Sequence, residues 1–312
     1  MKTVTIGATK WAVSNVALGT MRMSRLTVDQ TAAALLAAKE AGINYIDSAD
    51  IYGDGQAERN FAAAMKVAGL DRDAFYIQSK AGIVLDRKSG RKRYDFSKQH
   101  LLAAVDGILG RLGTDYLDTL LLHRPDALME VDEVAAVFDQ LQASGKVRHF
   151  GVSNFTPGQL ALLQEGLSQR LLINQVQFSL AHTGMLDAGF HANLATPAAL
   201  DHDGGILEDA RRRQLTIQTW SPFQQGLFGG TFINDEDHYG PLNQQLATLA
   251  AKYGVSKNAI AVAWLLRYPA QVQVLLGTIT PAHILDSARG SDLQLTRQEW
   301  YDLYVAAGND LP

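Results

Sequence analysis

The feature that most constrains the fold of this chain is a regular alternation of short apolar runs with longer segments of helical periodicity. The apolar runs, each expected to be a strand, span residues 16–20, 44–47, 75–80, 116–123, 147–152, 171–178, 215–220 and 272–276. They are continuously apolar rather than alternating, which is typical of parallel strands buried on both faces. No linker or low-complexity segment interrupts the alternation. We therefore predict an α/β fold, one (β/α)8 TIM barrel domain over residues 1–312.

Helix signals fill the gaps between these strands. The expected helices lie near residues 32–41, 56–68, 97–109, 131–141, 207–213, 241–253, 257–267 and 281–289. Capping-box spacing at Thr27 and Gln30, and again at Thr156 and Gln159, marks helix starts. Thr296 with Glu299 opens a C-terminal extra helix outside the barrel, and residues 3–6 and 10–13 read as an N-terminal β-hairpin.

Composition excludes several classes of protein. The 312 residues are 47% hydrophobic, enough for a large core, and the formal net charge of -4 gives no attraction to nucleic acid or an anionic membrane. The absence of cysteine excludes disulfides, thiolate metal sites and cysteine nucleophiles. No N-terminal apolar region resembles a signal peptide, and no apolar run approaches the roughly 20 residues of a membrane span. We expect a cytoplasmic protein, whose oligomeric state the sequence does not indicate.

Polar residues stand where the predicted strands end, and such ends converge on one mouth of a barrel. They are Asp47, Lys80, His123, Ser153, Asn154, Gln175, Trp220 and Ser221, with Tyr52 just beyond the strand that Asp47 ends. Each has an alternative reading: Asp47 and Asp50 as caps of the next helix, Lys80 as a solvated charge, His123 as a loop cap. As a set they indicate a functional site.

Several ordered motifs run through the same segments. They are Gly-Ile-Asn-Tyr-Ile-Asp-Ser-Ala-Asp-Ile-Tyr-Gly (42–53), Ser-Lys (79–80), Leu-Gly-Arg-Leu-Gly-Thr-Asp-Tyr-Leu-Asp (109–118), Leu-His-Arg-Pro (122–125), Gly-Lys-Val-Arg-His-Phe-Gly-Val-Ser-Asn-Phe (145–155), Asn-Gln (174–175), Trp-Ser-Pro (220–222) and Leu-Gly-Thr (276–278). By these motifs the chain resembles the aldo/keto reductase superfamily over essentially its whole length. It is most similar to a bacterial branch of predicted oxidoreductases.

The resemblance implies a catalytic tetrad of Asp47, Tyr52, Lys80 and His123. When hydride moves to a carbonyl carbon, charge develops on the oxygen and a proton must arrive. Tyr52 is expected to supply it as general acid in reduction, and to act as base in oxidation. A tyrosine has a pKa near 10, and we expect the Lys80 ammonium to lower it. Asp47 would hold Lys80 charged, and His123 would orient and polarise the substrate oxygen.

The resemblance also implies the contacts of a nicotinamide cofactor. Ser153, Asn154 and Gln175 would meet the carboxamide, and Trp220 would stack on the ring. The pyrophosphate path would be lined by Ser221, Pro222, Phe223 and Gly226. The other residues expected to bind the cofactor are Gly19, Thr20, Gly277, Thr278, His283, Asp286 and Ser287. Relatives usually carry arginine in place of His283, and often Glu-Asn in place of Asp286-Ser287. The resemblance implies NADPH as the cofactor. Histidine is a weaker phosphate partner than arginine, which weakens this expectation and makes NADH or dual use the alternative.

The expected activity is reduction of small aldehydes or ketones to alcohols. Two alternatives are a cofactor-binding regulatory subunit with little turnover and a dehydrogenase that oxidises a sugar-like alcohol. A third, an aldolase with Lys80 as Schiff base, is disfavoured because the neighbouring carboxylate keeps the amine charged.

The remaining polar features of the sequence carry no predicted chemistry. No metal site is expected, since His182, His191 and His202 lack ligand spacing. The basic cluster Arg87 to Arg93 reads either as a solvated flap or as a contact for an anionic substrate or cofactor. Met21 to Met23, Tyr94 and residues 223–239 are the expected substrate loops, and they do not name the substrate.

Overall fold

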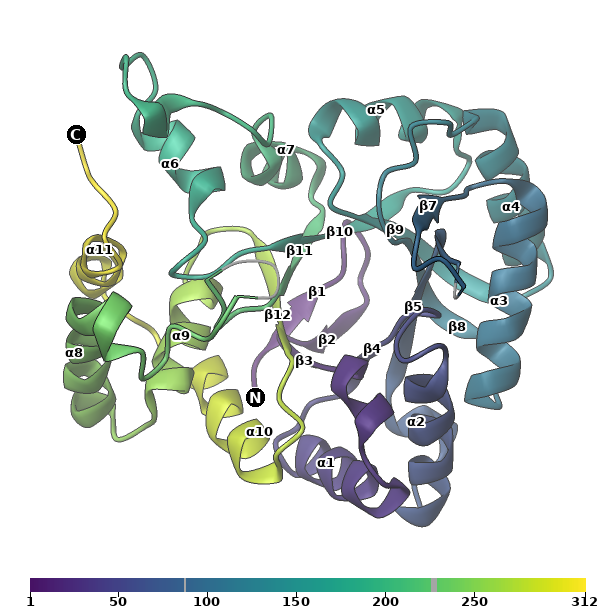
Figure 1. Cartoon of the computed structure of the whole chain (residues 1–312), viewed down its shortest axis with the longest axis horizontal. Helices are drawn as coiled ribbons and strands as arrows, with labels where there is room; N and C mark the ends of the chain where they lie inside the picture. Colours follow the sequence, from purple (N-terminus) through teal and green to yellow (C-terminus); the bar gives the residue numbers. More distant parts are fainter. Residues whose placement is uncertain (87, 226–228) are drawn as a thin grey trace.

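The barrel is closed by hydrogen bonding between its first and last strands. The computed structural model describes residues 1–86, 88–225 and 229–312. In this part of the chain, eight parallel strands pair in the order β3-β4-β5-β8-β9-β10-β11-β12, and β12 pairs with β3 (Figure 1). The strands are β3 (Val16–Gly19), β4 (Tyr45–Asp47), β5 (Tyr76–Ala81), β8 (Leu117–Leu122), β9 (Val147–Ser153), β10 (Leu171–Gln177), β11 (Thr216–Trp220) and β12 (Gln271–Leu276). The predicted (β/α)8 barrel is confirmed.

Helices surround the strands on the outside (Figure 1). They are α1 (Val28–Glu40), α2 (Gln56–Val67), α3 (Lys98–Leu112), α4 (Val131–Ala143), α5 (Pro157–Gly166), α6 (Gly184–Phe190), α7 (Ile206–Arg213), α8 (Glu236–Tyr253), α9 (Lys257–Leu266), α10 (Pro281–Ala288) and α11 (Arg297–Ala306). Short 3-10 turns add η1 (Met21–Arg25), η2 (Arg72–Ala74), η3 (Pro197–Ala199) and η4 (Arg289–Asp292). The capping boxes predicted at Thr27, Thr156 and Thr296 form at the starts of α1, α5 and α11. None of the helices in the described ranges is long and apolar enough to cross a bilayer.

The predicted hairpin, β1 (Thr3–Thr5) and β2 (Ala12–Ser14), closes the base of the barrel. Ile6 and Val13 are fully buried and belong to an apolar cluster with interior barrel residues such as Leu172 and Leu275. Gly7 is required in the turn, because its φ is +55° and a Cβ atom there would lie 2.8 Å from Leu172 Cδ2. Its N–H also donates to Thr216 Oγ1 at 2.8 Å, which ties the hairpin to β11.

The C-terminal extra helix is also confirmed. Trp264 of α9 and Trp300 of α11 stack with ring centroids 4.9 Å apart, and each indole N–H donates to the other residue's carbonyl at 3.0 Å. The shared aromatic and polar contact fixes α11 against the outer layer of helices.

Three elements differ from the sequence prediction. A small antiparallel hairpin, β6 (Ile83–Leu85) and β7 (Lys92–Tyr94), follows β5 and carries most of the basic cluster. Helix α6 was not predicted. Helix α8 begins at Glu236 rather than near residue 241, because Asp235 caps a first turn that kinks at Tyr239, two residues before Pro241.

Candidate active site

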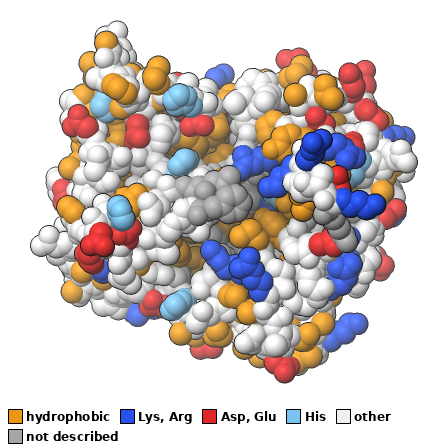
Figure 2. Space-filling model, in the orientation of Figure 1, with side chains coloured by type: hydrophobic (Ala, Val, Ile, Leu, Met, Phe, Trp, Pro, Cys, Tyr) orange, Lys and Arg blue, Asp and Glu red, His pale blue; other side chains and the backbone are white. Residues whose placement is uncertain are grey.

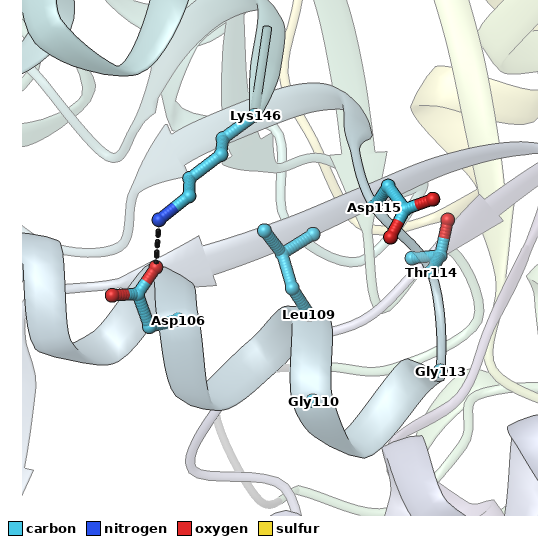
Figure 3. Close-up of a pocket in the computed structure, with 7 residues that line it drawn as sticks. All are labelled: Asp106, Leu109, Gly110, Gly113, Thr114, Asp115 and Lys146. Carbon is cyan, nitrogen blue, oxygen red and sulfur yellow. Dashed lines mark hydrogen bonds and ion pairs between the residues drawn. The ribbon is translucent and has the colours of Figure 1, made fainter. Parts of the chain in front are cut away.

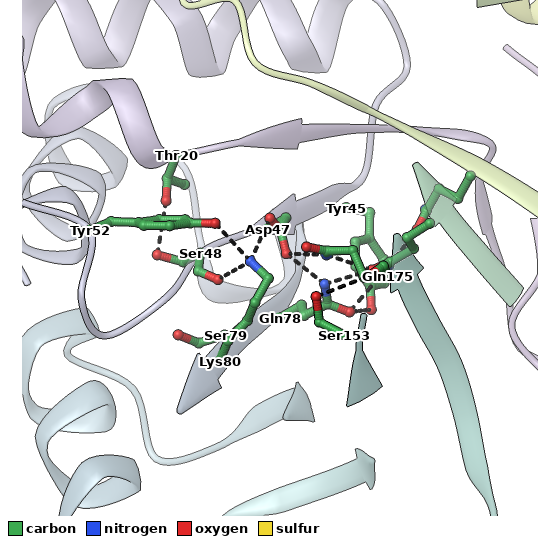
Figure 4. A network of polar contacts seen from close by, with 12 residues as sticks. Thr20, Tyr45, Asp47, Ser48, Tyr52, Gln78, Ser79, Lys80, Ser153 and Gln175 are labelled. Atoms are coloured by element: carbon green, nitrogen blue, oxygen red, sulfur yellow. Dashed lines mark hydrogen bonds and ion pairs between the residues drawn. The ribbon is translucent and has the colours of Figure 1, made fainter. Parts of the chain in front are cut away.

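The four residues of the predicted tetrad come together at the ends of β4, β5 and β8. Lys80 Nζ donates to Asp47 Oδ2 at 2.8 Å, to the Ser48 carbonyl at 2.7 Å and to Tyr52 Oη at 3.1 Å (Figure 4). The Tyr52 ring meets the His123 imidazole edge-on, with centroids 5.9 Å apart. The ammonium thus has three acceptors, and its position is determined by β4 and the loop that follows it.

Lys80 is a buried cation. Its side chain is 0% exposed and that of Asp47 is 6% exposed. Burial alone lowers the pKa of Lys80, but the Asp47 carboxylate and the Tyr52 hydroxyl outweigh it, so the net pKa of Lys80 is raised. The lysine is charged at neutral pH, which is the wrong state for Schiff-base formation.

The expectation that Lys80 lowers the pKa of Tyr52 overall is wrong for this structure. Burial raises the pKa of the Tyr52 phenol, and the Lys80 ammonium opposes this rise without overcoming it. The sequence indicated the partner but not the depth of burial. A phenol that keeps its proton at neutral pH is in the acid form that carbonyl reduction requires.

His123 is a neutral imidazole at physiological pH. Burial, with the nearby Lys80 and Arg124 cations, holds the pKa of His123 well below 6.5. Its Nδ1 is buried without a hydrogen-bond partner among the described residues. Nδ1 is therefore uncommitted within the described chain, and the imidazole can hydrogen-bond a ligand.

The alternative in which Asp47 and Asp50 cap the next helix does not hold. Gly55 is the N-cap of α2 and provides no side-chain cap. Asp47 pairs with Lys80, and Asp50 Oδ1 is buried with no partner in the described chain. Burial and the neighbouring Glu58 carboxylate raise the pKa of Asp50 from 3.8 to about 7.

This gives a prediction for stability against pH. Because the folded protein binds the Asp50 proton more tightly than the unfolded chain, folding is favoured at low pH. That contribution is lost as the pH rises from 3.8 to about 7. We expect Asp50→Asn to stabilise the protein by about 1–3 kcal/mol more at pH 8 than at pH 4. Thermal unfolding of both proteins across this range measures it, and equal gains at both ends would contradict it.

A second group of predicted residues lies at the ends of β9, β10 and β11. Ser153 Oγ donates to the Gln175 carbonyl at 2.9 Å, and Asn154 Nδ2 donates to Ser153 Oγ at 2.7 Å. Trp220 Nε1 donates to Asn154 Oδ1 at 3.1 Å. Asn154 and Ser221 both have positive φ, 62° and 52°, which is uncommon outside glycine and often found at functional sites. The group is held in place by its own contacts.

The other predicted cofactor residues form an arc over β3, β11 and β12. Thr20 is buried and donates to Ser48 Oγ at 2.8 Å, and a Cβ on Gly19 would come 3.2 Å from the Leu276 carbonyl. Pro222 is buried and His283 is exposed. The partly buried residues are Ser221, Phe223, Gly277, Thr278 and Asp286. Ser287 is fully buried, so solvent does not reach it, and its Oγ has no hydrogen-bond partner among the described residues. Gly226 lies outside the described residues.

The free polar groups at these strand ends fit a nicotinamide. No hydrogen bond among the described residues uses Gln175 Oε1, which leaves an acceptor for carboxamide N–H groups. Beside Gly277, which is predicted to lie at the adenosine end, Arg22 Nη1 donates to the Gly277 carbonyl at 2.6 Å. A Cβ on Gly277 would clash with this guanidinium at 2.6 Å, so glycine allows the cation to lie against the segment.

Sequence reasoning missed two sets of residues at the site. Gln78, Gln218 and Gln273 are fully buried inside the barrel below the tetrad. Glutamines within otherwise apolar strands were the available signal. Arg124 was also missed: its guanidinium carbon lies 5.8 Å from the Trp220 ring centroid, and it makes no hydrogen bond or ion pair with the described residues.

Cations gather on the face that Figure 2 shows, although the chain is acidic overall. Lys88, Arg91, Lys92 and Arg93 are exposed on or beside the β6–β7 hairpin, and Arg22 is exposed after β3. Arg87 of the basic cluster lies outside the described residues. The exposed cations agree with a solvated flap and leave open a contact with an anionic ligand.

A shallow hollow of about 380 Å³ lies away from this chemistry, between the C-terminal end of α3 and Lys146 (Figure 3). Lys146 pairs with Asp106 across it at 2.6 Å. Neither residue contacts a tetrad residue, and the hollow adds nothing to the site.

The barrel and its buried lysine–aspartate–tyrosine group define the class of protein as a (β/α)8-barrel oxidoreductase. The aldo/keto reductase family model matches residues 15–304, and the chain belongs to this family. It is 37% identical over 277 residues to oxidoreductase YdhF of Escherichia coli, covering 88% of this chain and 86% of that protein. It is also 37% identical over 271 residues to a 6-dehydroglucose reductase of Agrobacterium fabrum, covering 85% and 84%. An aldo/keto reductase of Klebsiella pneumoniae, solved with NADP and acetate, superposes with a TM-score of 0.78 at 25% identity over 100% of this chain and 97% of its own.

Proposed function

We propose that this protein reduces small aldehydes or ketones to alcohols with NADPH, and that Tyr52 is the general acid. The observation that carries the proposal is the 3.1 Å contact between Tyr52 Oη and Lys80 Nζ, with Asp47 holding the lysine on its other side. A carbonyl oxygen bound between Tyr52 and His123 receives two hydrogen bonds where negative charge develops.

Each residue then has one task. A bound nicotinamide supplies the hydride. His123, neutral, donates to the substrate oxygen and fixes its orientation. Tyr52 transfers its proton to that oxygen, and the adjacent Lys80 ammonium stabilises the phenolate that forms. Asp47 positions the ammonium and balances its charge.

The cofactor is held by side chains at the strand ends. Gln175 Oε1 and the Ser153–Asn154 pair are expected to bind the carboxamide, with Trp220 along the ring. Gly19, Thr20 and the segment from Ser221 to Phe223 would line the pyrophosphate. Gly277, Thr278, His283 and Asp286 would form the adenosine end, whereas Ser287 is fully buried and is left out of it. His283 is a weaker phosphate partner than arginine, so the preference for NADPH over NADH is expected to be modest.

The substrate class we favour is a sugar-like aldehyde. The support is the identity of 37% with a protein named 6-dehydroglucose reductase. Arg124 agrees with this class, because its guanidinium, which makes no hydrogen bond or ion pair with the described residues, offers several donors to hydroxyl or carboxylate oxygens.

The experiment that tests this proposal measures both cofactor binding and carbonyl turnover. We expect NADPH to quench tryptophan fluorescence strongly in the native protein and weakly in Trp220→Phe. We expect NADPH to be consumed with a six-carbon sugar aldehyde faster than with a short aliphatic aldehyde. Tighter NADH binding would shift the proposal towards oxidation. The proposal would be withdrawn if neither nucleotide bound in this and a label-free assay.

A further inference from the structure

A layer of glutamines lies inside the barrel, level with Asp47 and two residues before Lys80 along β5. It consists of Gln78, Gln175, Gln218 and Gln273, from β5, β10, β11 and β12, and we call it the glutamine layer (Figure 4 shows part of it). Gln78, Gln218 and Gln273 are 0% exposed, and Gln175 is 3% exposed. Barrel interiors are usually filled by branched apolar residues. Four buried amides there need an explanation in terms of their partners.

The layer ends on the carboxylate of Asp47. Asp47 Oδ1 accepts from Gln78 Nε2 at 2.6 Å and from Gln175 Nε2 at 2.9 Å, while Oδ2 accepts from Lys80. Gln218 Oε1 accepts from the same two amides, at 2.8 and 2.9 Å, and so holds them together. One carboxylate oxygen is thus occupied by the layer, which leaves the other directed at the lysine.

The direction of every amide follows from the two ends of the layer. At the far end, Gln273 Nε2 donates to the Ser14 carbonyl at 2.7 Å, and its Oε1 accepts from Gln218 Nε2 at 2.8 Å. A carbonyl and a carboxylate only accept, so turning any one amide over would face oxygen against oxygen or nitrogen against nitrogen. The layer therefore has a single low-energy arrangement.

Strand register explains why these residues meet. Asp47 is paired with Gln78 between β4 and β5, and Gln175, Gln218 and Gln273 are paired in turn across β10, β11 and β12. The contact between Gln78 and Gln218 joins these two groups of strands across the interior of the barrel. A shift of register in either group would break the contact with Asp47.

We propose that Gln78 and Gln218 are positioning residues for the reaction, because they hold Asp47 in the rotamer that aligns Lys80 with Tyr52. The inference rests on the function proposed above. It extends that function to residues that touch neither substrate nor cofactor. A buried Asp47 carboxylate that was free to rotate would cost stability and would leave the ammonium misaligned.

The test is a double-mutant cycle on kcat that combines Gln78→Met with Asp47→Asn. Gln78→Met keeps the volume of the side chain and removes its amide. We expect kcat to fall about 10- to 100-fold, while KM and the NADPH dissociation constant change less than about threefold. In an Asp47→Asn background we expect Gln78→Met to cost no further activity, because the group it positions is already lost. A merely structural role would give additive losses.

Gln169→Met is the matched control. Gln169 is also buried and donates to Asp139 Oδ1 at 2.7 Å and Gln142 Oε1 at 3.2 Å, away from the tetrad. It should lower the melting temperature and leave kcat intact. If Gln78→Met fails to fold, Gln218→Met and Gln273→Met replace it, with a larger fall in kcat expected for Gln218 than for Gln273.

The outcomes separate the two proposals. Full activity in Gln78→Met, or additive losses with Asp47→Asn, would overturn the positioning role while native turnover keeps the reductase proposal intact. If Gln78→Met does not fold, equal kcat in Gln218→Met and the native protein overturns it instead. Absence of carbonyl turnover in the native protein would remove the proposed function itself.

Discussion

Replacing Tyr52 with phenylalanine is expected to lower kcat about 10²- to 10⁴-fold and to leave NADPH affinity nearly unchanged. The substitution removes the hydroxyl that lies 3.1 Å from Lys80 Nζ and keeps the ring that meets His123 edge-on. Burial holds the proton on this phenol by raising its pKa, so the lost group is the acid itself. Steady-state kinetics measures kcat, and quenching of tryptophan fluorescence measures NADPH affinity on the same samples.

Tyr304→Phe provides the control for this variant. Tyr304 is a fully buried tyrosine of α11 whose hydroxyl donates to Asp187 Oδ1 at 2.6 Å, remote from the tetrad. Its loss should reduce stability and not kcat. Undiminished turnover in Tyr52→Phe would count against general acid catalysis by this residue. No carbonyl turnover in the native protein, with cofactor still bound, would favour the regulatory-subunit alternative.

Lys80→Met is expected to affect stability and activity together. It leaves the Asp47 carboxylate buried without its counter-charge, and breaking a buried ion pair from one side costs about 3–5 kcal/mol. Activity should fall by a factor comparable to that of Tyr52→Phe, since the developing phenolate loses its ammonium. Chemical denaturation and steady-state kinetics measure the two losses.

Two comparisons separate these effects. Adding Asp47→Leu to Lys80→Met removes the unpaired charge, so stability should largely return while activity does not. Lys146→Met breaks the exposed pair with Asp106, whose side chains are 40% and 59% exposed, and should change stability by about 1 kcal/mol or less. If Lys80→Met were as mild as Lys146→Met, the buried pair would not have the importance assigned to it.

The sequence predicted the barrel well because its strands are nearly continuous apolar runs and its helix starts carry capping boxes. The polar strand ends indicated one functional site, and the resemblance to the aldo/keto reductases implied which four residues form its tetrad. The structure brings these four residues together. The hairpin of β6 and β7 was missed because its second strand, Lys92 to Tyr94, has no apolar run to mark it. The predicted barrel and the missed hairpin both follow from local patterns.

The electrostatic state of the site depends on quantities that local patterns do not contain. The pKa of Tyr52 is set first by burial and only then by Lys80, and burial depends on every loop around the mouth. The glutamine layer depends on register between strands that are distant in sequence, such as Gln78 and Gln218. A glutamine in a strand indicates polarity, whereas its partner across the barrel appears only in three dimensions.

The hairpin at the base has a consequence for the response of the protein to salt. Ile6 and Val13 are fully buried and fill that end, so mobile ions do not approach the interior past these two side chains. The screening length in physiological salt is about 8 Å, so added electrolyte weakens attraction between exposed cations such as Arg22 and an incoming phosphate. The field between Asp47 and Lys80, enclosed by protein, is almost unscreened. Ionic strength should therefore govern how readily this protein captures its charged ligands and have little influence on the chemical step that follows.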